Sequence, residues 1–289
     1  MTENAGPTKT LTAPQTAAAL PSARWGDLRL RVLSAAVLAP LALGCIWFGG
    51  LAIAALVGLI IAGLAFEWIQ LCERRVSPVA ALGFIPLPGA VALTAAGSGE
   101  GALMLLAVAT IAVSVHSGGI GWAKPLAFGI PYLGLGSVAL VWLRQVPGSG
   151  RDDVIVLLLL VWASDIGAYL IGRALGGPRL APSISPGKTW SGAFGGLAAA
   201  VAVGFVAAAT LGNGTSPVRA VCFAALTGCV SQAGDLFESR LKRHFGVKDS
   251  GWLIPGHGGL LDRLDAVLFA APVAGLLALT PGGGVGIWQ

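Results

Sequence analysis

The sequence predicts an all-α membrane protein, a polytopic bundle of about nine transmembrane helices with the N-terminus inside. Of its 289 residues, 55% are hydrophobic and only 11% are charged, whereas a soluble globular domain carries about 25% charged residues. The mean hydropathy of +0.82 agrees with this composition. Apolar stretches near the ~20 residues that cross a bilayer recur along the chain. Lysine and arginine are also distributed unevenly between the segments that join these stretches.

The chain begins with a segment that does not resemble a membrane span. Residues 1–24 are rich in Thr, Ala and Pro and have no apolar period, so we expect a disordered tail. A cleaved signal peptide is not expected, because the first long apolar run follows Arg29 and Arg31. Beyond the tail, the sequence predicts N-terminal transmembrane helices over 25–150 and a C-terminal transmembrane catalytic region over 151–289.

Nine apolar stretches account for the predicted spans. Two are less regular: 32–66 could instead be one re-entrant hairpin, and His116 with nearby glycines interrupts another. Gly192 and Gly196 form a GxxxG step, which suits close helix packing. The nine stretches are 32–48, 49–66, 78–97, 102–121, 125–143, 154–172, 190–211, 217–234 and 266–283.

The basic residues predict the orientation. With the N-terminus inside and nine crossings, 15 of the 18 Lys and Arg residues fall on the inside, and only Arg144, Arg151 and Arg219 fall outside. Positive charge collects in cytoplasmic loops. The polar segments 173–189 and 235–265 should therefore face the cytoplasm, and a bacterial inner membrane is the expected location. The net charge of +5 follows from this bias, and nucleic acid is not an expected partner, since no basic module stands outside the membrane.

The segment 235–265 is the most polar part of the chain. Asp235, Ser239 and Lys242 lie at i, i+4 and i+7 and so share one helix face, where they could hold a hard cation and a phosphate together. The glycine-rich centre lets backbone N–H groups approach phosphate oxygens. Asp262 and Asp265 share a face at the start of the last helix, where the dipole suits anions. Such oxygen ligands favour Mg²⁺ or Mn²⁺ over zinc.

A simpler interpretation of this segment is a solvated loop with i,i+4 ion pairs. Glu238 is expected only to pair with Lys242, so Glu238→Gln should be nearly silent. His257 is either an acid/base group or a structural hydrogen-bonding group. Asp165 lies inside an apolar run, where a carboxylate is costly and usually paired or functional. Ser185 and Lys188 precede a helix and are candidate phosphate ligands, although Lys188 is equally one more positive-inside residue.

The same residues resemble a known signature, that of the phosphatidate cytidylyltransferases (CDP-diacylglycerol synthases). A second family segment, W-x-x-D followed by S-P-x-K-T-W, corresponds to Trp162 to Asp165 and Ser185 to Trp190. In that segment Gly187 and Ser191 stand where the family often has Lys and Glu. The main match covers 27 residues. It runs through Ser239-Arg-Leu-Lys242-Arg243, Lys248-Asp249-Ser-Gly251 and Pro255-Gly-His257-Gly258-Gly259-Leu-Leu-Asp262-Arg263-Leu-Asp265.

The resemblance implies transfer of CMP from CTP to phosphatidic acid, giving CDP-diacylglycerol and pyrophosphate. Asp235 and Asp262, with Ser239, would then hold the metal, while Asp165, His257, Lys242 and Arg263 would complete the catalytic set. CTP, phosphatidic acid and membrane lipids are the expected partners, with a homodimer as an open alternative. A CTP-dependent lipid-alcohol kinase and an ion or solute transporter are the competing functions. The remaining implied substrate-binding residues are Arg243, Lys248, Asp249, Gly258, Gly259, Ser185, Lys188 and Asp265.

Overall fold

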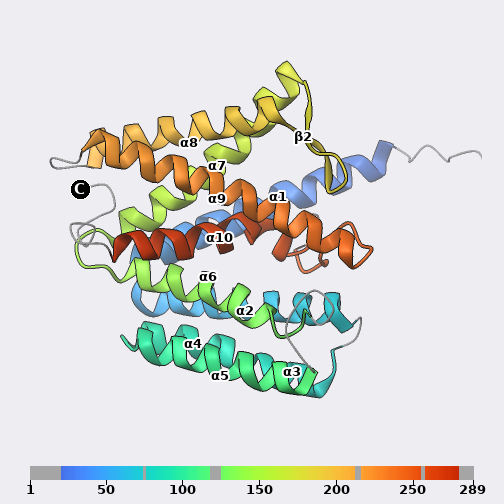
Figure 1. Ribbon diagram of the computed structural model, residues 1–289, viewed down its shortest axis with the longest axis vertical. Helices are drawn as coiled ribbons and strands as arrows, with labels where there is room; N and C mark the ends of the chain where they lie inside the picture. The colour runs from blue at the N-terminus through green and yellow to red at the C-terminus, as the bar shows by residue number, and fades with distance from the viewer. Residues whose placement is uncertain (1–20, 74–75, 118–124, 212–215, 255–257, 280–289) are drawn as a thin grey trace, which may run out of the picture.

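The computed structural model describes residues 21–73, 76–117, 125–211, 216–254 and 258–279. It is a bundle of roughly aligned helices, with one short hairpin of two antiparallel strands at one end (Figure 1). The N-terminal half contains α1 (Pro21–Phe48), α2 (Gly50–Glu73), α3 (Pro78–Phe84), α4 (Pro86–Ala95), α5 (Gly99–Ser117) and α6 (Gly129–Arg144). The C-terminal half contains α7 (Gly150–Leu175), β1 (Arg179–Ala181), β2 (Ser185–Thr189), α8 (Trp190–Leu211), α9 (Pro217–His244) and α10 (Leu261–Ala278).

Within the described residues, each predicted apolar stretch contains helix, but the helices differ in length from the stretches, and 118–121 and 280–283 lie outside the described part. The stretch 32–66 forms two helices that meet at Gly49, which adopts a φ of 67°. The stretch 78–97 is divided at Ile85, because Pro86 begins a new helix. Helix α1 begins at Pro21, inside the predicted tail, and residues 1–20 lie outside the described part.

Among the described residues, six helical segments are long and apolar enough to cross a membrane, with α3 and α4 counted together as one. The all-α, polytopic prediction is therefore confirmed, while the count of nine and the inside N-terminus stay predictions. Helix α6 and the part of α1 from Ala36 to Phe48 are apolar but shorter. The six are Gly50–Glu73, Pro78–Ala95, Gly99–Ser117, Gly150–Leu175, Trp190–Leu211 and Pro217–His244.

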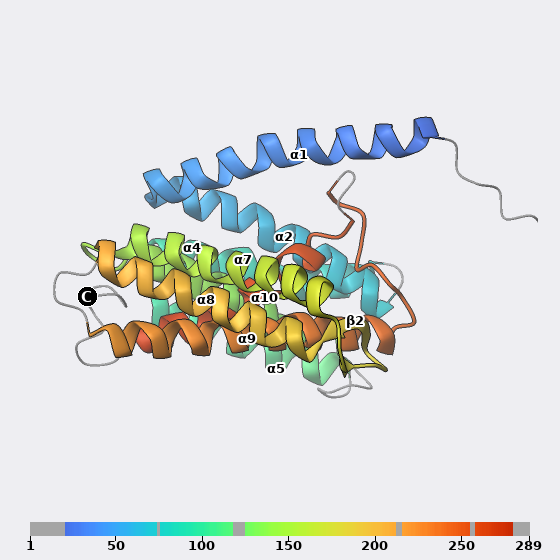
Figure 2. The same cartoon turned by 90° about the horizontal axis from the view of Figure 1, so that it is seen from above.

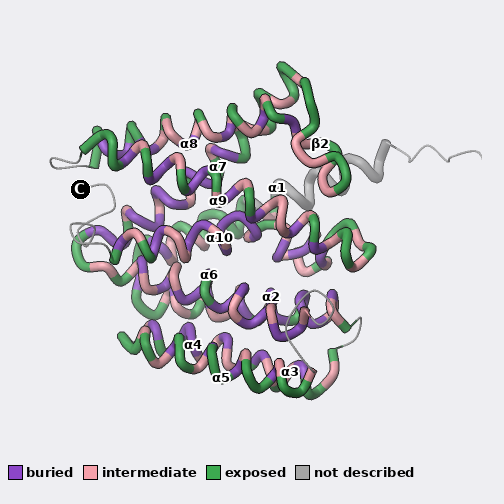
Figure 3. Tube along the Cα trace, in the orientation of Figure 1, coloured by how far each residue is buried: buried purple, intermediate pink, exposed green. Residues whose placement is uncertain are grey.

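Burial follows the arrangement expected of a bundle in lipid. Buried residues lie where helices face one another, and exposed residues line the outward sides of α5 and α8 (Figure 3). Many exposed side chains on the outward faces are large and apolar, among them Met104 on α5 and Phe194 on α8, which are 72% and 64% exposed. In water such a surface would be unfavourable, whereas lipid tails solvate it.

Helices α7 and α8 approach each other through glycine. A Cβ atom on Gly192 would lie 2.8 Å from the Ala168 carbonyl oxygen, and one on Gly196 would lie 2.5 Å from that of Ser164. Both distances are too short for any side chain, so the predicted GxxxG packing is confirmed. The amide of Gln232 on α9 donates to Ser164 Oγ and to the Ala193 carbonyl. These contacts fix α7, α8 and α9 next to the strand hairpin.

Candidate active site

The polar residues of the C-terminal half collect at one end of the bundle. This end comprises the last turns of α7 and α9, the β1–β2 hairpin, the loop after α9 and the first turn of α10 (Figure 2). The segments 173–189 and 235–265, which the sequence singled out separately, are therefore neighbours in space. Helix α9 packs against both the hairpin and α10.

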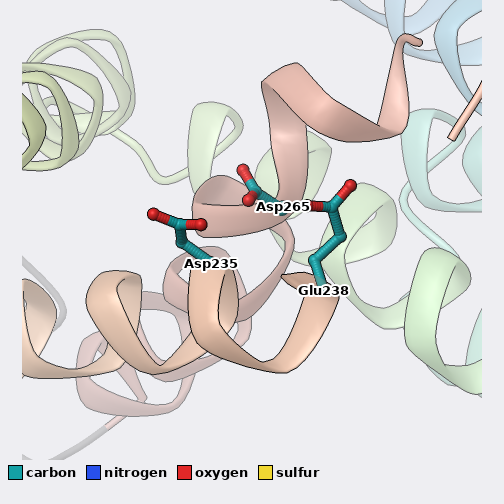
Figure 4. A group of neighbouring side chains, drawn as sticks. All are labelled: Asp235, Glu238 and Asp265. Atoms are coloured by element: carbon teal, nitrogen blue, oxygen red, sulfur yellow. The ribbon is translucent and has the colours of Figure 1, made fainter. Parts of the chain in front are cut away.

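Three carboxylates meet between α9 and α10. Asp235 and Glu238 lie one turn apart on α9, and Asp265 faces them from α10 (Figure 4). One oxygen from each lies within 4.8 Å of the others. Glu238 is 1% exposed and Asp265 is 8% exposed, and Glu238 Oε1 has no hydrogen-bond partner among the described residues. Closely spaced carboxylates repel one another, so this cluster fits a hard divalent cation with oxygen ligands.

Two lysines contact different members of the carboxylate cluster. Lys188, on β2, forms an ion pair with Asp235. Lys242, on α9, contacts Glu238 and Asp262 at 2.8 Å each. The predicted pair of Glu238 with Lys242 is therefore present, but it is buried rather than solvated, and Glu238 belongs to the cluster. The pair is buried because the next helix covers that side of α9.

The Asp262 carboxylate organises the loop that precedes its own helix. Besides Lys242, it accepts hydrogen bonds from the backbone N–H groups of Ser250, at 3.1 and 3.2 Å, and Gly259, at 3.1 Å. Both of its oxygens are therefore engaged by donors. Asp262 and Asp235 lie on different helices, as expected, but Asp235 lies inside α9, which continues to His244, and the carboxylate that faces Asp235 across the helices belongs to Asp265.

A residue that the sequence analysis did not single out holds this loop from the N-terminal half. Glu67, on α2, is 1% exposed. It accepts hydrogen bonds from the backbone N–H groups of Leu260 and Leu261 at 2.8 Å each, and from Ser250 Oγ at 3.4 Å. These N–H groups belong to the unpaired donors of the α10 N-terminus, so Glu67 caps α10 from another helix.

The glycines of the loop permit this close approach. A Cβ on Gly259 would lie 2.0 Å from Ser250 Oγ, and one on Gly251 would lie 2.5 Å from Glu67 Oε1. Gly258 has a φ of 81°, and its carbonyl accepts a hydrogen bond from the Ile254 N–H at 3.1 Å. The predicted glycine-rich centre thus packs backbone directly against two carboxylates.

A cavity of about 550 Å³ lies on the other side of Asp235, between α7, α8, α9 and the hairpin. Asp165, Ser185 and Lys188 of the second family segment line it together with Asp235, whose carboxylate also belongs to the cluster with Asp265 of the main segment. Arg173 and Arg179, which the sequence analysis counted only as inside charges, line it as well. The signal that could have assigned these two arginines to the site was the concentration of basic residues around the hairpin.

Several other predicted residues lie at the edge of the site. Arg243 is exposed and donates to the carbonyl oxygens of Ile184 and Val247 at 3.4 Å each, which links the α9 end to the hairpin turn. Lys248, Asp249 and Arg263 are exposed, and Ser239 is partly buried. His257 lies outside the described residues.

The comparisons with known proteins agree with this site. The family model described as "Cytidylyltransferase family" matches residues 29–280. The chain belongs to this family. A phosphatidate cytidylyltransferase from Brucella suis is 39% identical over 256 residues, covering 85% of this chain and 91% of the relative. One from Pseudomonas aeruginosa is 38% identical over 270 residues, covering 89% and 99%.

Membership of the cytidylyltransferase family makes the chain a nucleotidyltransferase, and its apolar helices make it a multi-pass membrane protein. The match extends over the N-terminal half, which the sequence analysis described only as hydrophobic. That half supplies Glu67 to the site. The signal for Glu67 was available, because it is a carboxylate within a long apolar run, but the predicted span ended at residue 66 and left it outside.

Proposed function

We propose that this protein transfers CMP from CTP to phosphatidic acid, forming CDP-diacylglycerol and pyrophosphate on the cytoplasmic face of a bacterial inner membrane. The observation that carries the proposal is the carboxylate cluster of Asp235, Glu238 and Asp265 with two lysines in contact with it. Two polyanions must meet in this reaction, so their charge must be neutralised. Clustered carboxylates that hold a cation, together with the two lysines, meet that requirement.

Mg²⁺ or Mn²⁺ is the proposed cofactor, and Asp235, Glu238 and Asp265 would hold it. Once bound, the ion would neutralise phosphate oxygens and polarise the α-phosphorus. Asp262, which the sequence analysis placed among the metal ligands, is proposed instead to orient Lys242 and the glycine loop, because both of its oxygens already accept hydrogen bonds. Ser239 stays a predicted additional ligand.

The residues of the chain would act by binding and positioning. A lipid phosphate oxygen forms the new bond to the α-phosphorus of CTP. The bond from that phosphorus to the oxygen bridging to the β-phosphate breaks, and pyrophosphate leaves with the electron pair. The attacking group is already an anion, so no strong general base is required. Lys242, fixed by Glu238 and Asp262, is proposed to stabilise the leaving pyrophosphate, with exposed Arg243, Lys248 and Arg263 beside it.

Purified protein in mixed micelles tests the reaction directly. With CTP and phosphatidic acid, label on the α-phosphorus should appear in the lipid, and label on the γ-phosphorus should appear in pyrophosphate. Transfer of the γ-label to lipid would establish the kinase alternative. EDTA should abolish turnover and Mg²⁺ or Mn²⁺ should restore it, since the cluster offers only oxygens. Turnover that persists in chelator would contradict the metal assignment. The oligomeric state of the same sample tests the predicted homodimer.

A further inference from the structure

The cavity between α7, α8, α9 and the hairpin contains positive charge that its carboxylates do not balance. Arg173 lies in the last turn of α7, Arg179 is the first residue of β1 and Lys188 lies on β2. Lys188 pairs with Asp235, but neither arginine has an ion-pair partner among the described residues. The Arg179 guanidinium donates one hydrogen bond, 3.3 Å long, to the Gly187 carbonyl, which holds it on the hairpin and leaves other N–H groups unused. Two exposed guanidinium groups at one cavity suit a phosphate.

The outer wall of the cavity belongs to the lipid-facing surface. Helices α7 and α8 form this wall, and Tyr169, which lines the cavity, is 64% exposed. Trp190 and Phe194, on the first turns of α8, are 50% and 64% exposed. Tyrosine and tryptophan prefer the head-group level of a membrane. The cavity therefore lies at the depth of lipid phosphates, where α7 ends and α8 begins.

The cavity and Lys242 contact different members of the carboxylate cluster. Asp235 pairs with Lys188 in the cavity, whereas Glu238, one turn further along α9, pairs with Lys242. An anion in the cavity and an anion at Lys242 would thus meet at the cluster. A lipid can keep its acyl chains in the bilayer while its phosphate enters beside α7 and α8. A nucleotide arrives from water, and Lys248 and Asp249 are exposed on the loop that follows Lys242 and the end of α9.

We propose that this cavity binds the phosphate monoester head group of the lipid substrate, with Arg173 and Arg179 as its guanidinium ligands. The assignment rests on the proposed function and adds which substrate anion binds next to which member of the cluster. Two planar guanidinium groups recognise a terminal phosphate through paired hydrogen bonds, which a lysine cannot reproduce. The cavity therefore favours a monoester, whose three terminal oxygens are free, over lipids with an esterified head group.

The test compares Arg173→Gln, Arg179→Gln and the double variant in mixed micelles. The mole fraction of phosphatidic acid and the concentration of CTP are varied separately. For the double variant we expect the KM for the lipid to rise about tenfold, equivalent to ~1.4 kcal/mol, with the KM for CTP unchanged. Arg240→Gln is the matched control, since Arg240 is exposed on α9 at the same end but does not line the cavity. Arg173→Lys and Arg179→Lys, which keep the charge, should recover only part of the lipid affinity.

A direct binding measurement separates this inference from the proposed function. Calorimetric titration of the protein with short-chain phosphatidic acid, without CTP, requires no turnover. Weaker binding by the glutamine variants at unchanged thermal stability supports the assignment. A raised KM for CTP with unchanged lipid binding would place the nucleotide in the cavity and overturn it, and so would variants that match wild type in both measurements. Absence of CDP-diacylglycerol formation by the wild-type protein would instead refute the proposed function.

Discussion

Individual carboxylates at the polar end differ in what surrounds them. Asp262 is surrounded by donors, whereas Glu238 is as deeply buried as any charged group described and keeps one oxygen without a partner. A buried carboxylate oxygen without a donor is costly unless a cation or a proton meets it. This difference leads us to assign charge neutralisation of the substrates to the Asp235, Glu238 and Asp265 cluster and loop positioning to Asp262.

Substitutions in the cluster test this assignment. Asp235→Asn and Glu238→Gln should each lower turnover by about a hundredfold or more, which corresponds to ~2.7 kcal/mol of transition-state stabilisation. Both should also raise the Mg²⁺ concentration needed for half-maximal rate. Asp262→Asn should slow turnover without this change in Mg²⁺ requirement. It removes the negative charge that orients Lys242 and the loop, and leaves the cluster itself intact. Steady-state rates over a Mg²⁺ series provide the measurement. A Glu238→Gln enzyme with wild-type rates would restore the solvated ion-pair interpretation.

The glycine loop offers a steric test at the same scale. Gly259→Ala adds a methyl carbon that would lie only 2.0 Å from Ser250 Oγ and 2.7 Å from the Gly251 backbone nitrogen. Overpacking of this kind costs ~1–3 kcal/mol, so we expect kcat/KM for CTP to fall at least about tenfold. Gly58→Ala on α2 is the control, since a Cβ there meets nothing within 4 Å. Equal activity of the two variants would show that the loop geometry is irrelevant to nucleotide use.

At the level of helices, the site depends on how α10 begins. No side chain caps its N-terminus from the usual preceding position. Glu67 on α2 accepts the N–H groups of Leu260 and Leu261 instead, while Asp262 on α10 itself accepts that of Gly259, just before the helix. The cap from α2 fixes the first turn of α10 and thereby the position of Asp265 opposite α9. Helix α2 thus supports the cluster without contributing to it.

Removal of this cap should change metal use. In Glu67→Gln an amide N–H₂ group would face backbone donors, so we expect weaker capping, lower thermal stability and an apparent Mg²⁺ affinity reduced about tenfold, or ~1.4 kcal/mol. The control is Asp153→Asn. Asp153 is also 1% exposed and accepts a hydrogen bond from Ser149 Oγ, in the first turn of α7 at the other end of the bundle. The Asp153→Asn variant should lose thermal stability but keep its Mg²⁺ affinity. A Glu67→Gln enzyme with unchanged Mg²⁺ dependence would reduce Glu67 to a structural role.

In the molecule as a whole, the polar groups lie at one end and the apolar helices extend away from it. At the opposite end, Arg144 on α6 donates hydrogen bonds to the Ile46 and Trp47 carbonyls and so links α6 to the end of α1. The Arg151 guanidinium carbon lies 4.4 Å from the centre of the Trp47 ring. These are two of the three basic residues predicted to lie outside. The contacts at this end therefore use Arg144 and Arg151, whereas Lys188 and Lys242 contact the carboxylates at the polar end.

Cysteine labelling tests the predicted orientation. In a chain whose four cysteines are replaced by alanine, Trp252→Cys lies in the loop after α9 and Val218→Cys at the start of α9, where the native side chains are 72% and 69% exposed. An impermeant maleimide should label position 218 in intact spheroplasts and position 252 only after permeabilisation, as the Lys and Arg distribution predicts. The reverse pattern would place the active site outside.

The sequence by itself determined the features that depend on local composition. Apolar length located the described helices, with α3 and α4 inside one stretch, and the order of charged residues and glycines from Ser239 to Asp265 identified the family and the candidate catalytic segment. Such local patterns cannot identify a site residue that lies far from this segment in the chain. Local order also cannot show where a long apolar run breaks, and the division at Ile85 depended on the single Pro86.

Only the tertiary structure decided which charged groups meet. Glu67 and Leu261 are 194 positions apart, and their contact exists because α2 packs beside the start of α10. Asp262 and Asp265 share one helix face in sequence terms, yet one faces Lys242 and backbone donors while the other faces Asp235 and Glu238. The physical reason is that the chemical role of a carboxylate depends on the hydrogen-bond donors and charges within a few ångströms of it. In a bundle these come from helices that the chain reaches much later.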